Sequence, residues 1–209
     1  MIKQYMAGLL PERNALIKQL EMTARDEKIP VLQSESVQFL RLLLQIINPQ
    51  NILEIGTAIG YSALHMAEAA ANARIITLEI DPERARRARL HFSQAKVADR
   101  VEVIEGDALE TIPRLKQNFD FVFLDAAKGK YAEFFALVFP LLAPGGVLLT
   151  DNVLFRGMVA LDDDEIDKKY RNMVQKLKKF NKLLATHPDL DTAFVPVGDG
   201  LAVSRKRGE

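Results

Sequence analysis

One segment organises the chain: Asn51-Ile52-Leu53-Glu54-Ile55-Gly56-Thr57-Ala58-Ile59-Gly60-Tyr61-Ser62, an apolar run that leads through a glycine-punctuated turn into a helical pattern. In a doubly wound α/β sheet, such a turn lies where the sheet changes direction, and nucleotide-like ligands bind there. Gly56 allows the backbone to approach a ligand closely, and a helix beginning near Gly60 presents unpaired N–H groups. The segment therefore predicts a cofactor pocket.

The turn departs from the dinucleotide-binding fingerprint. G-x-G-x-x-G requires a second glycine at position 58, but that residue is Ala58, so NAD is disfavoured. The turn instead has the pattern E-x-G-x-x-x-G, with Glu54 two residues before the first glycine. A second acid, Glu79, ends the next predicted strand at 74–79, where a carboxylate can accept hydrogen bonds from both ribose hydroxyls of a nucleoside.

This arrangement resembles that of the S-adenosylmethionine-dependent methyltransferases. In that class the first acid lies near the amino-acid end of the cofactor, and the second acid holds the ribose. By this resemblance, Glu54 and Gly56 belong to the cofactor site, and Glu79 holds the ribose.

Composition indicates a soluble globular protein of one domain. The chain has 209 residues, of which 48% are hydrophobic and 27% charged, and its formal net charge is zero. It has no cysteine, which excludes disulfides, thiolate metal ligands and cysteine nucleophiles. No apolar run approaches the roughly 20 residues of a membrane helix, and the first residues lack a signal-peptide pattern, so a cytoplasmic protein is expected.

Strands and helices alternate regularly after residue 48. Such alternation predicts right-handed crossovers and a parallel sheet, and apolar strands of this kind are buried on both faces. The predicted strands are 51–56, 74–79, 101–105, 119–124 and 146–150, and the predicted helices are 61–71, 82–96, 108–116 and 131–142.

The two ends of the chain carry further elements. Residues 1–47 are predicted to form an N-terminal helical extension ahead of a core at 48–209. In the extension, a short and a longer helix lie on either side of Pro11, and a third helix spans Val37 to Ile47 with Ser34 as its N-cap. The C-terminal part is expected to contain a basic helix at 165–186 and a hairpin of strands 192–197 and 200–205 around the turn Val197-Gly198-Asp199-Gly200.

Polar residues follow two predicted strands where each strand ends. Asp125 follows strand 119–124, and Asp151 and Asn152 follow strand 146–150. Because the carboxyl ends of parallel strands line one crevice, these side chains are expected to converge near the cofactor. Two carboxylates and an amide oxygen suit a hard cation such as Mg²⁺. The alternative for each acid is that it only caps the helix that follows it.

A lysine accompanies the candidate metal ligands. Lys128 lies three residues after Asp125, and the usual place of a lysine is the solvated surface. Beside a cation in a partly closed cleft, its ammonium would have a lowered pKa, which makes Lys128 a candidate general base.

Three segments make the resemblance more specific. The chain is similar to the cation-dependent O-methyltransferases of the catechol and caffeoyl-coenzyme A type, and the similarity covers nearly its whole length. It implies a Rossmann-like fold with a mostly parallel seven-stranded sheet, a C-terminal antiparallel hairpin, extra N-terminal helices and a homodimer. The segments are 124–131 (LDAAKGKY), 150–157 (TDNVLFRG) and 196–201 (PVGDGL).

The resemblance also assigns the site residues. The metal ligands would be Asp125, Asp151 and Asn152, and Lys128 occupies the position of the base in the catechol enzymes. The remaining cofactor contacts would come from Leu32 and Ser62 at the methionine end, from Asp107 and Ala108 at the adenine, and from Asp125.

Two acceptor classes are open. Within the family, residues 54–62, 125–128 and 151–157 resemble those of the bacterial methyltransferases of tRNA 5-hydroxyuridine, whose product at the anticodon wobble position is 5-methoxyuridine. The alternative is a small molecule with vicinal hydroxyls, such as a catechol or a caffeoyl-CoA-like ester. Ala127 stands where the catechol enzymes have an aromatic residue, which argues against a small catechol.

Basic residues could form a surface for RNA, or could simply be a solvated helix face balanced by the acids at 162–165. A non-catalytic cofactor-binding module is a further alternative, and the complete set of candidate metal and base residues argues against it. The basic residues are Arg84, Arg86, Arg87, Arg89, Arg156, Lys168, Lys169, Arg171, Lys176, Lys178, Lys179, Lys182, Arg205, Lys206 and Arg207.

Overall fold

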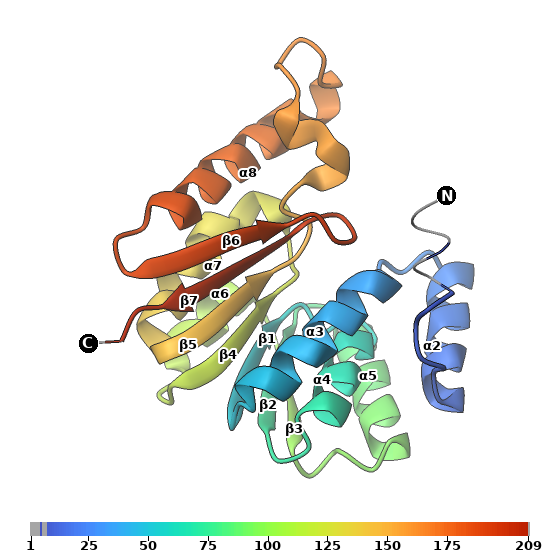
Figure 1. The fold of residues 1–209 in the computed structure, drawn as a ribbon. Helices are drawn as coiled ribbons and strands as arrows, with labels where there is room; N and C mark the ends of the chain where they lie inside the picture. The colour runs from blue at the N-terminus through green and yellow to red at the C-terminus, as the bar shows by residue number, and fades with distance from the viewer. Residues whose placement is uncertain (1–4, 6–7, 209) are drawn as a thin grey trace. The chain divides into compact units, whose positions relative to one another are not determined.

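The computed structural model describes Tyr5 and residues 8–208 (Figure 1). It divides into two compact units, Met1–Asp107 and Ala108–Glu209. The strand order is β3-β2-β1-β4-β5-β7-β6, which confirms the predicted Rossmann-like α/β sheet with a C-terminal antiparallel hairpin. Within the described residues, no helix is long and apolar enough to cross a membrane.

The first unit is a parallel three-stranded part of the sheet with its helices. Strands β1 and β2 pair with Ile52 opposite Ile75, and β2 and β3 pair with Ile75 opposite Val101. Its elements are α2 (Ala15–Asp26), α3 (Ser34–Ile47), β1 (Asn51–Ile55), α4 (Tyr61–Ala69), β2 (Arg74–Glu79), α5 (Pro82–Gln94) and β3 (Val101–Glu105).

Helix starts in this unit follow the expected capping chemistry with one correction. Asn14 caps α2 by accepting from the N–H of Ile17, and Asp81 caps α5 with Pro82 in the first turn. The prediction that Ser34 caps α3 is wrong, because the helix already includes Ser34, and Gln33 at the N-cap makes no side-chain capping bond. The short helix predicted before Pro11 falls largely on residues 1–4 and 6–7, which lie outside the described residues.

The second unit contains the carboxyl-terminal half of the sheet. Strands β4 and β5 are parallel, with Leu124 opposite Thr150, and β7 runs antiparallel to both β5 and β6. The elements are α6 (Ala108–Thr111), η1 (Ile112–Arg114), β4 (Phe119–Leu124), η2 (Lys128–Lys130), α7 (Tyr131–Val138), η3 (Phe139–Leu141), β5 (Leu142–Thr150), η4 (Phe155–Ala160), α8 (Lys168–Thr186), β6 (Leu190–Val195) and β7 (Leu201–Lys206).

Prolines account for the shortened helices of this unit. The helix predicted at 108–116 becomes a single α-turn followed by a 3₁₀ turn that contains Pro113, and the helix predicted to reach 142 gives way at Val138 to a 3₁₀ turn that contains Pro140. Proline has no N–H to donate to the preceding turn. Helix α8 begins at Lys168, capped by Asp167, instead of at the predicted 165.

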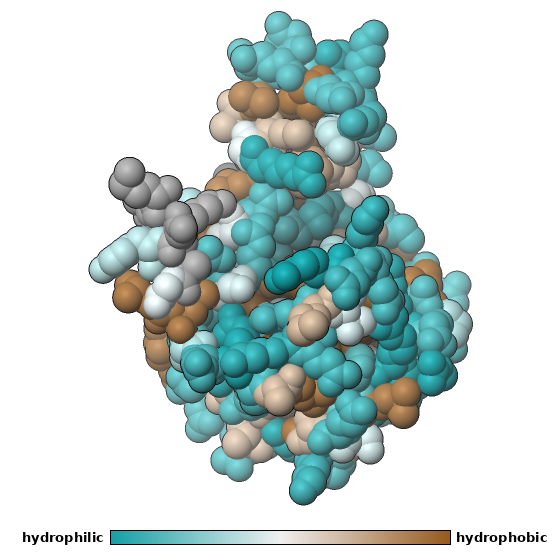
Figure 2. Space-filling model, turned by 90° about the vertical axis from the view of Figure 1, so that its right-hand side faces the viewer, coloured by the Kyte–Doolittle hydropathy of each residue, from teal (hydrophilic) through white to brown (hydrophobic). Residues whose placement is uncertain are grey.

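Strand interiors form the core of both units. The apolar residues of β1 and β4 are at most 1% exposed, as expected for strands covered on both faces. Hydrophilic residues predominate on the face shown in Figure 2, where the hydrophobic ones form separate patches.

Candidate active site

A buried carboxylate holds the glycine turn of the first unit. Glu54 is fully buried in β1, and its two oxygens accept hydrogen bonds from the hydroxyls of Ser62 in α4 and Thr77 in β2. Thr77 and Thr57 are joined by a hydroxyl–hydroxyl contact of 2.5 Å. These bonds tie β1, β2 and α4 together beneath the turn. Glu54 and Ser62, both predicted at the cofactor's methionine end, are therefore hydrogen-bonded to each other.

Glu79, the predicted ribose ligand, lies at the end of β2 and fixes the conformation of the same turn. Its carboxylate accepts from the backbone N–H of Ala58 at 2.7 Å and from that of Asp81 at 3.0 Å. Ala58 has a φ of 47°, a left-handed conformation that is unfavourable for a residue with a side chain. The acid therefore stabilises a strained position of the cofactor turn.

Gly60 is required by packing as well as by conformation. Its φ is 88°, and a Cβ added there would lie 2.8 Å from the ring of Phe92 in α5. The sequence indicated only that a helix begins near this glycine. Gly60 also allows the turn to pack closely against α5, and the residues next to it in the sequence give no sign of that contact.

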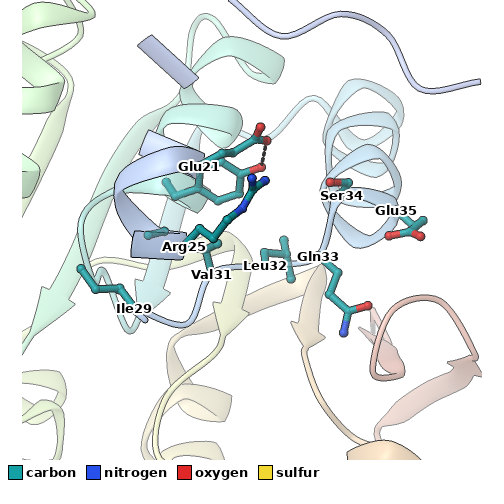
Figure 3. Close-up of a pocket in the computed structure, with 10 residues that line it drawn as sticks. Glu21, Arg25, Ile29, Val31, Leu32, Gln33, Ser34 and Glu35 are labelled. Atoms are coloured by element: carbon teal, nitrogen blue, oxygen red, sulfur yellow. Dashed lines mark hydrogen bonds between the residues drawn. The ribbon is translucent and has the colours of Figure 1, made fainter. Parts of the chain in front are cut away.

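An open cavity of about 490 Å³ lies beside α2, α3 and the start of α4 (Figure 3). Leu32, predicted at the methionine end, lines this cavity together with Tyr61, the neighbour of Ser62. The Tyr61 hydroxyl donates to Glu21 at 2.6 Å, and burial raises the pKa of Tyr61, a shift that the hydrogen bond to Glu21 reinforces. The structure thus places Leu32 in the same region of the first unit as Tyr61, the residue next to Ser62. Asp107 and Ala108, predicted at the adenine, are both half-buried.

In the second unit, the ends of β4 and β5 carry the predicted metal ligands. The backbone N–H of Asp151 donates to the carbonyl of Leu124 at 3.1 Å, which holds the two strand ends together. Asp151 is 4% exposed, and its Oδ1 atom is buried without a hydrogen-bond partner among the described residues. A buried carboxylate oxygen without a partner is costly unless a ligand completes it.

The electrostatics of the two acids show that they are neighbours. The pKa of Asp151 is raised to about 7, first by burial and then by the nearby charge of Asp125, against the lowering effects of the hydrogen bond from Asn152 and the charge of Lys128. Burial also raises the pKa of Asp125, and Lys128 opposes that shift. The structure therefore brings Asp125, Asp151 and Lys128 together, as the sequence predicts.

Neither acid caps a helix, so the capping alternative is wrong. The N-caps of the 3₁₀ turns η2 and η4 are Ala127 and Leu154. Among the described residues, no three side chains of the His, Asp and Glu types gather as a metal site. The candidate set is instead two carboxylates and the amide of Asn152, an all-oxygen donor set that fits Mg²⁺.

Two residues that the sequence analysis did not assign also belong to this site. The buried hydroxyl of Tyr131 donates to the backbone carbonyl of Asp151 at 3.1 Å, and its pKa lies well above the usual range because of burial and the surrounding acids. Asp199, in the turn between β6 and β7, lies 3.5 Å from the amide nitrogen of Asn152. In the sequence, Asp199 belongs to the predicted hairpin turn and to segment 196–201 of the family resemblance, but neither assigned it a role in the site.

Comparisons with known proteins agree with this geometry. A family model described as O-methyltransferase matches residues 10–207. The chain is 32% identical to a catechol O-methyltransferase of Niastella koreensis, over 97% of this chain and 95% of that protein. It is 33% identical to caffeoyl-CoA O-methyltransferase 1 of Eucalyptus globulus, over 95% and 85% of the respective chains. The crystal structure of an O-methyltransferase from Bacillus cereus in complex with SAH superposes with a TM-score of 0.86 at 29% identity, covering 99% of this chain and 97% of that one.

Proposed function

Because the chain belongs to the family of cation-dependent, S-adenosylmethionine-using O-methyltransferases, we propose that it methylates one of two vicinal oxygens at the carboxyl ends of β4 and β5 with the help of Mg²⁺. The observation that carries this proposal is the buried Oδ1 of Asp151, which has no hydrogen-bond partner among Tyr5 and residues 8–208 and lies beside a second carboxylate. Asp125, Asp151 and Asn152 would hold the cation. Bound there, it would lower the pKa of an acceptor hydroxyl and orient it.

The residues of the chain have separate roles in this reaction. The first unit binds S-adenosylmethionine through the turn at 56–60, with Glu79 at the ribose and Leu32 and Ser62 at the methionine end. In the second unit, Lys128 accepts the proton of the acceptor hydroxyl. An O–CH₃ bond forms as the S–CH₃ bond breaks, and S-adenosylhomocysteine leaves.

The relatives support a small acceptor with vicinal oxygens. They include a catechol O-methyltransferase and a caffeoyl-CoA O-methyltransferase. Catechols offer two adjacent hydroxyls, which suit chelation by a single cation. We therefore expect caffeoyl-type compounds to be methylated in preference to a small catechol, because Ala127 stands where the catechol enzymes have an aromatic residue.

The test combines chelation with mutation. Activity on caffeate-type acceptors should disappear in EDTA and return with Mg²⁺. Asp151→Ala should lower kcat by about 10³-fold, since a Lewis acid supplies several kcal/mol of barrier reduction. Binding of S-adenosylhomocysteine should change less than about twofold, because the first unit carries most of the proposed contacts. Full activity in EDTA would contradict the proposal.

A second candidate acceptor is 5-hydroxyuridine in the wobble position of tRNA, which offers its 5-hydroxyl and 4-carbonyl oxygens. The observation that favours it is a lysine face on α8. The side chains of the four residues of this face are exposed and make no ion pair or hydrogen bond within the described part of the chain, and one of them, Lys176, places its Cδ 4.0 Å from a Cβ built on Gly129 in η2. The lysine face consists of Lys168, Lys176, Lys179 and Lys182.

Lys176 of the lysine face lies beside the turn η2 that contains Lys128, where a phosphate backbone could be held while one unstacked base enters the site. Methylation of total tRNA from a deletion strain, compared with methylation of caffeate-type acceptors, separates the two candidates. If tRNA is the acceptor, changing Lys176, Lys179 and Lys182 to Gln should weaken tRNA binding and flatten its salt dependence. Lys169→Gln is the matched control, because Lys169 is paired with Asp167.

Assembly and location are also part of this proposal. We expect a homodimer that buries exposed apolar residues of α2 and α3, of which Met22, Leu42 and Ile46 are 62%, 53% and 72% exposed. Light scattering coupled to gel filtration would report the mass directly. A cytoplasmic location remains a prediction from the sequence.

A further inference from the structure

The turn between β6 and β7 holds the loop that follows Asp151. The carbonyl oxygen of Asp199 accepts from the N–H of Leu154 at 3.1 Å, and that of Gly200 accepts from Val153 at 3.0 Å. A carboxylate oxygen of Asp199 also accepts a short hydrogen bond from the N–H of Arg156. The contact is so close that a Cβ on Gly200 would lie 2.3 Å from Leu154.

The loop held in this way is strained. Asn152, Phe155 and Arg156 have φ values of 58°, 41° and 55°, all in the left-handed region. This region is unfavourable for residues with a side chain, most of all for a bulky aromatic, and such residues persist only where their surroundings fix them. The Asp199 carboxylate contacts the loop at two of these positions, Asn152 and Arg156.

The contact with Asn152 selects one orientation of its amide. A side-chain amide has a donor end and an acceptor end of nearly the same shape, whereas an ionised carboxylate can only accept. The Asn152 nitrogen lies 3.5 Å from the second oxygen of Asp199, and reversing the amide would set two oxygens against each other. The amide oxygen is therefore directed away from Asp199.

We propose that Asp199 is a positioning residue that presents the oxygen of Asn152, and not its NH₂ group, to the cation. This inference rests on the proposed metal site, and Asp199 acts in it only through the side-chain amide of Asn152. Carboxylates that orient the ligands of a metal in this way contribute strongly to its affinity.

The experiment measures the affinity for Mn²⁺ by calorimetry, in the full-length protein and without acceptor. Asp199→Asn keeps an oxygen for the Arg156 N–H but no longer dictates the amide orientation, so Mn²⁺ should bind about 10- to 100-fold more weakly. Binding of S-adenosylhomocysteine should be unchanged. The matched control is Asp191→Asn, an exposed acid of the same hairpin that pairs with Arg207, and it should bind Mn²⁺ like the wild type.

A double-mutant cycle distinguishes positioning from a general structural role. In an Asn152→Ala background, Asp199→Asn should cause no further loss of Mn²⁺ affinity, because the residue through which it acts is gone. Thermal melting in EDTA verifies that each variant is folded. If Asp199→Asn does not fold, Asp199→Ser, whose shorter side chain does not reach Asn152, should give the same loss.

The two proposals fail in different ways. Unchanged Mn²⁺ affinity in Asp199→Asn, or an equal loss in both Asn152 backgrounds, would overturn the role of Asp199 while leaving the metal site intact. Absence of Mn²⁺ binding in the wild type would overturn both the metal site and this inference.

Discussion

Two buried carboxylates, one in each unit, differ in how they are satisfied. Glu54 is fully buried, and both of its oxygens accept hydroxyl hydrogen bonds. Asp151 is almost as buried, but its Oδ1 has no partner in the described residues, and its pKa is raised to about 7 by burial and by the charge of Asp125. The comparison separates a carboxylate that stabilises the fold from one that is prepared for a ligand.

The largest effect on stability should come from removing the satisfied acid. Glu54→Ala leaves the hydroxyls of Ser62 and Thr77 buried without their acceptor, and hydrogen bonds to a charged group contribute about 1.5–3 kcal/mol each. We expect a loss of about 4 kcal/mol in the free energy of unfolding, measured by urea denaturation. The control is Glu83→Ala, a change at an exposed acid, which should leave the free energy of unfolding nearly unchanged. A small effect of Glu54→Ala on the free energy of unfolding would contradict the view that Glu54, unlike Asp151, stabilises the fold.

The next largest effect should come from the cofactor turn. In Gly60→Ala, the new Cβ would lie 2.8 Å from the Phe92 ring, and the alanine would have to keep a φ of 88°. The steric overlap and the backbone strain would both destabilise the protein. The expected loss is about 3 kcal/mol, together with weaker binding of S-adenosylhomocysteine. In Gly157→Ala, φ is also positive, but the new Cβ has no atom of the described residues within 4 Å apart from its chain neighbours, so this variant isolates the backbone strain. Equal losses in the two variants would show that the packing against Phe92 contributes nothing.

A smaller, pH-dependent effect should come from His65 in α4. Burial, followed by the charges of Arg13 and Arg41, lowers the pKa of His65 from 6.5 to about 3. Because the folded state favours the neutral ring, His65 contributes stability above pH 6.5 that is lost as the pH falls toward 3. At pH 5 the loss should be about 2 kcal/mol, and His65→Gln should remove this part of the acid sensitivity. Identical pH profiles of the two proteins would contradict this assignment.

The features that could be predicted from the sequence are those that depend on neighbouring residues, such as strand bounds and the acids at strand ends. Strands β3 and β4 begin and end where the apolar runs indicate, and the acids that follow β4 and β5 are brought together as expected. Helix ends at Pro113 and Pro140 were misplaced because the apolar periodicity continues past the point where proline stops α-helical bonding.

The missed parts of the site depend on contacts between distant residues. Tyr131 bonds to a carbonyl 20 residues away, and Asp199 reaches Asn152 across 47 residues. Neither contact leaves a periodic signal, since each depends on the register of paired strands and on the path of a loop. The same holds for Gly60, whose close neighbour is Phe92 in another helix.

The most direct test of the difference between the two acids is a Mg²⁺ titration of the purified protein. One cation should bind per chain of the wild type. In Asp151→Asn, the heat of binding should disappear or the affinity should fall by at least about 100-fold, whereas the exposed control Asp191→Asn should bind Mg²⁺ with unchanged affinity. Binding that survives Asp151→Asn at full affinity, or no binding to the wild type, would contradict the assignment of Asp151 as an acid prepared for a cation.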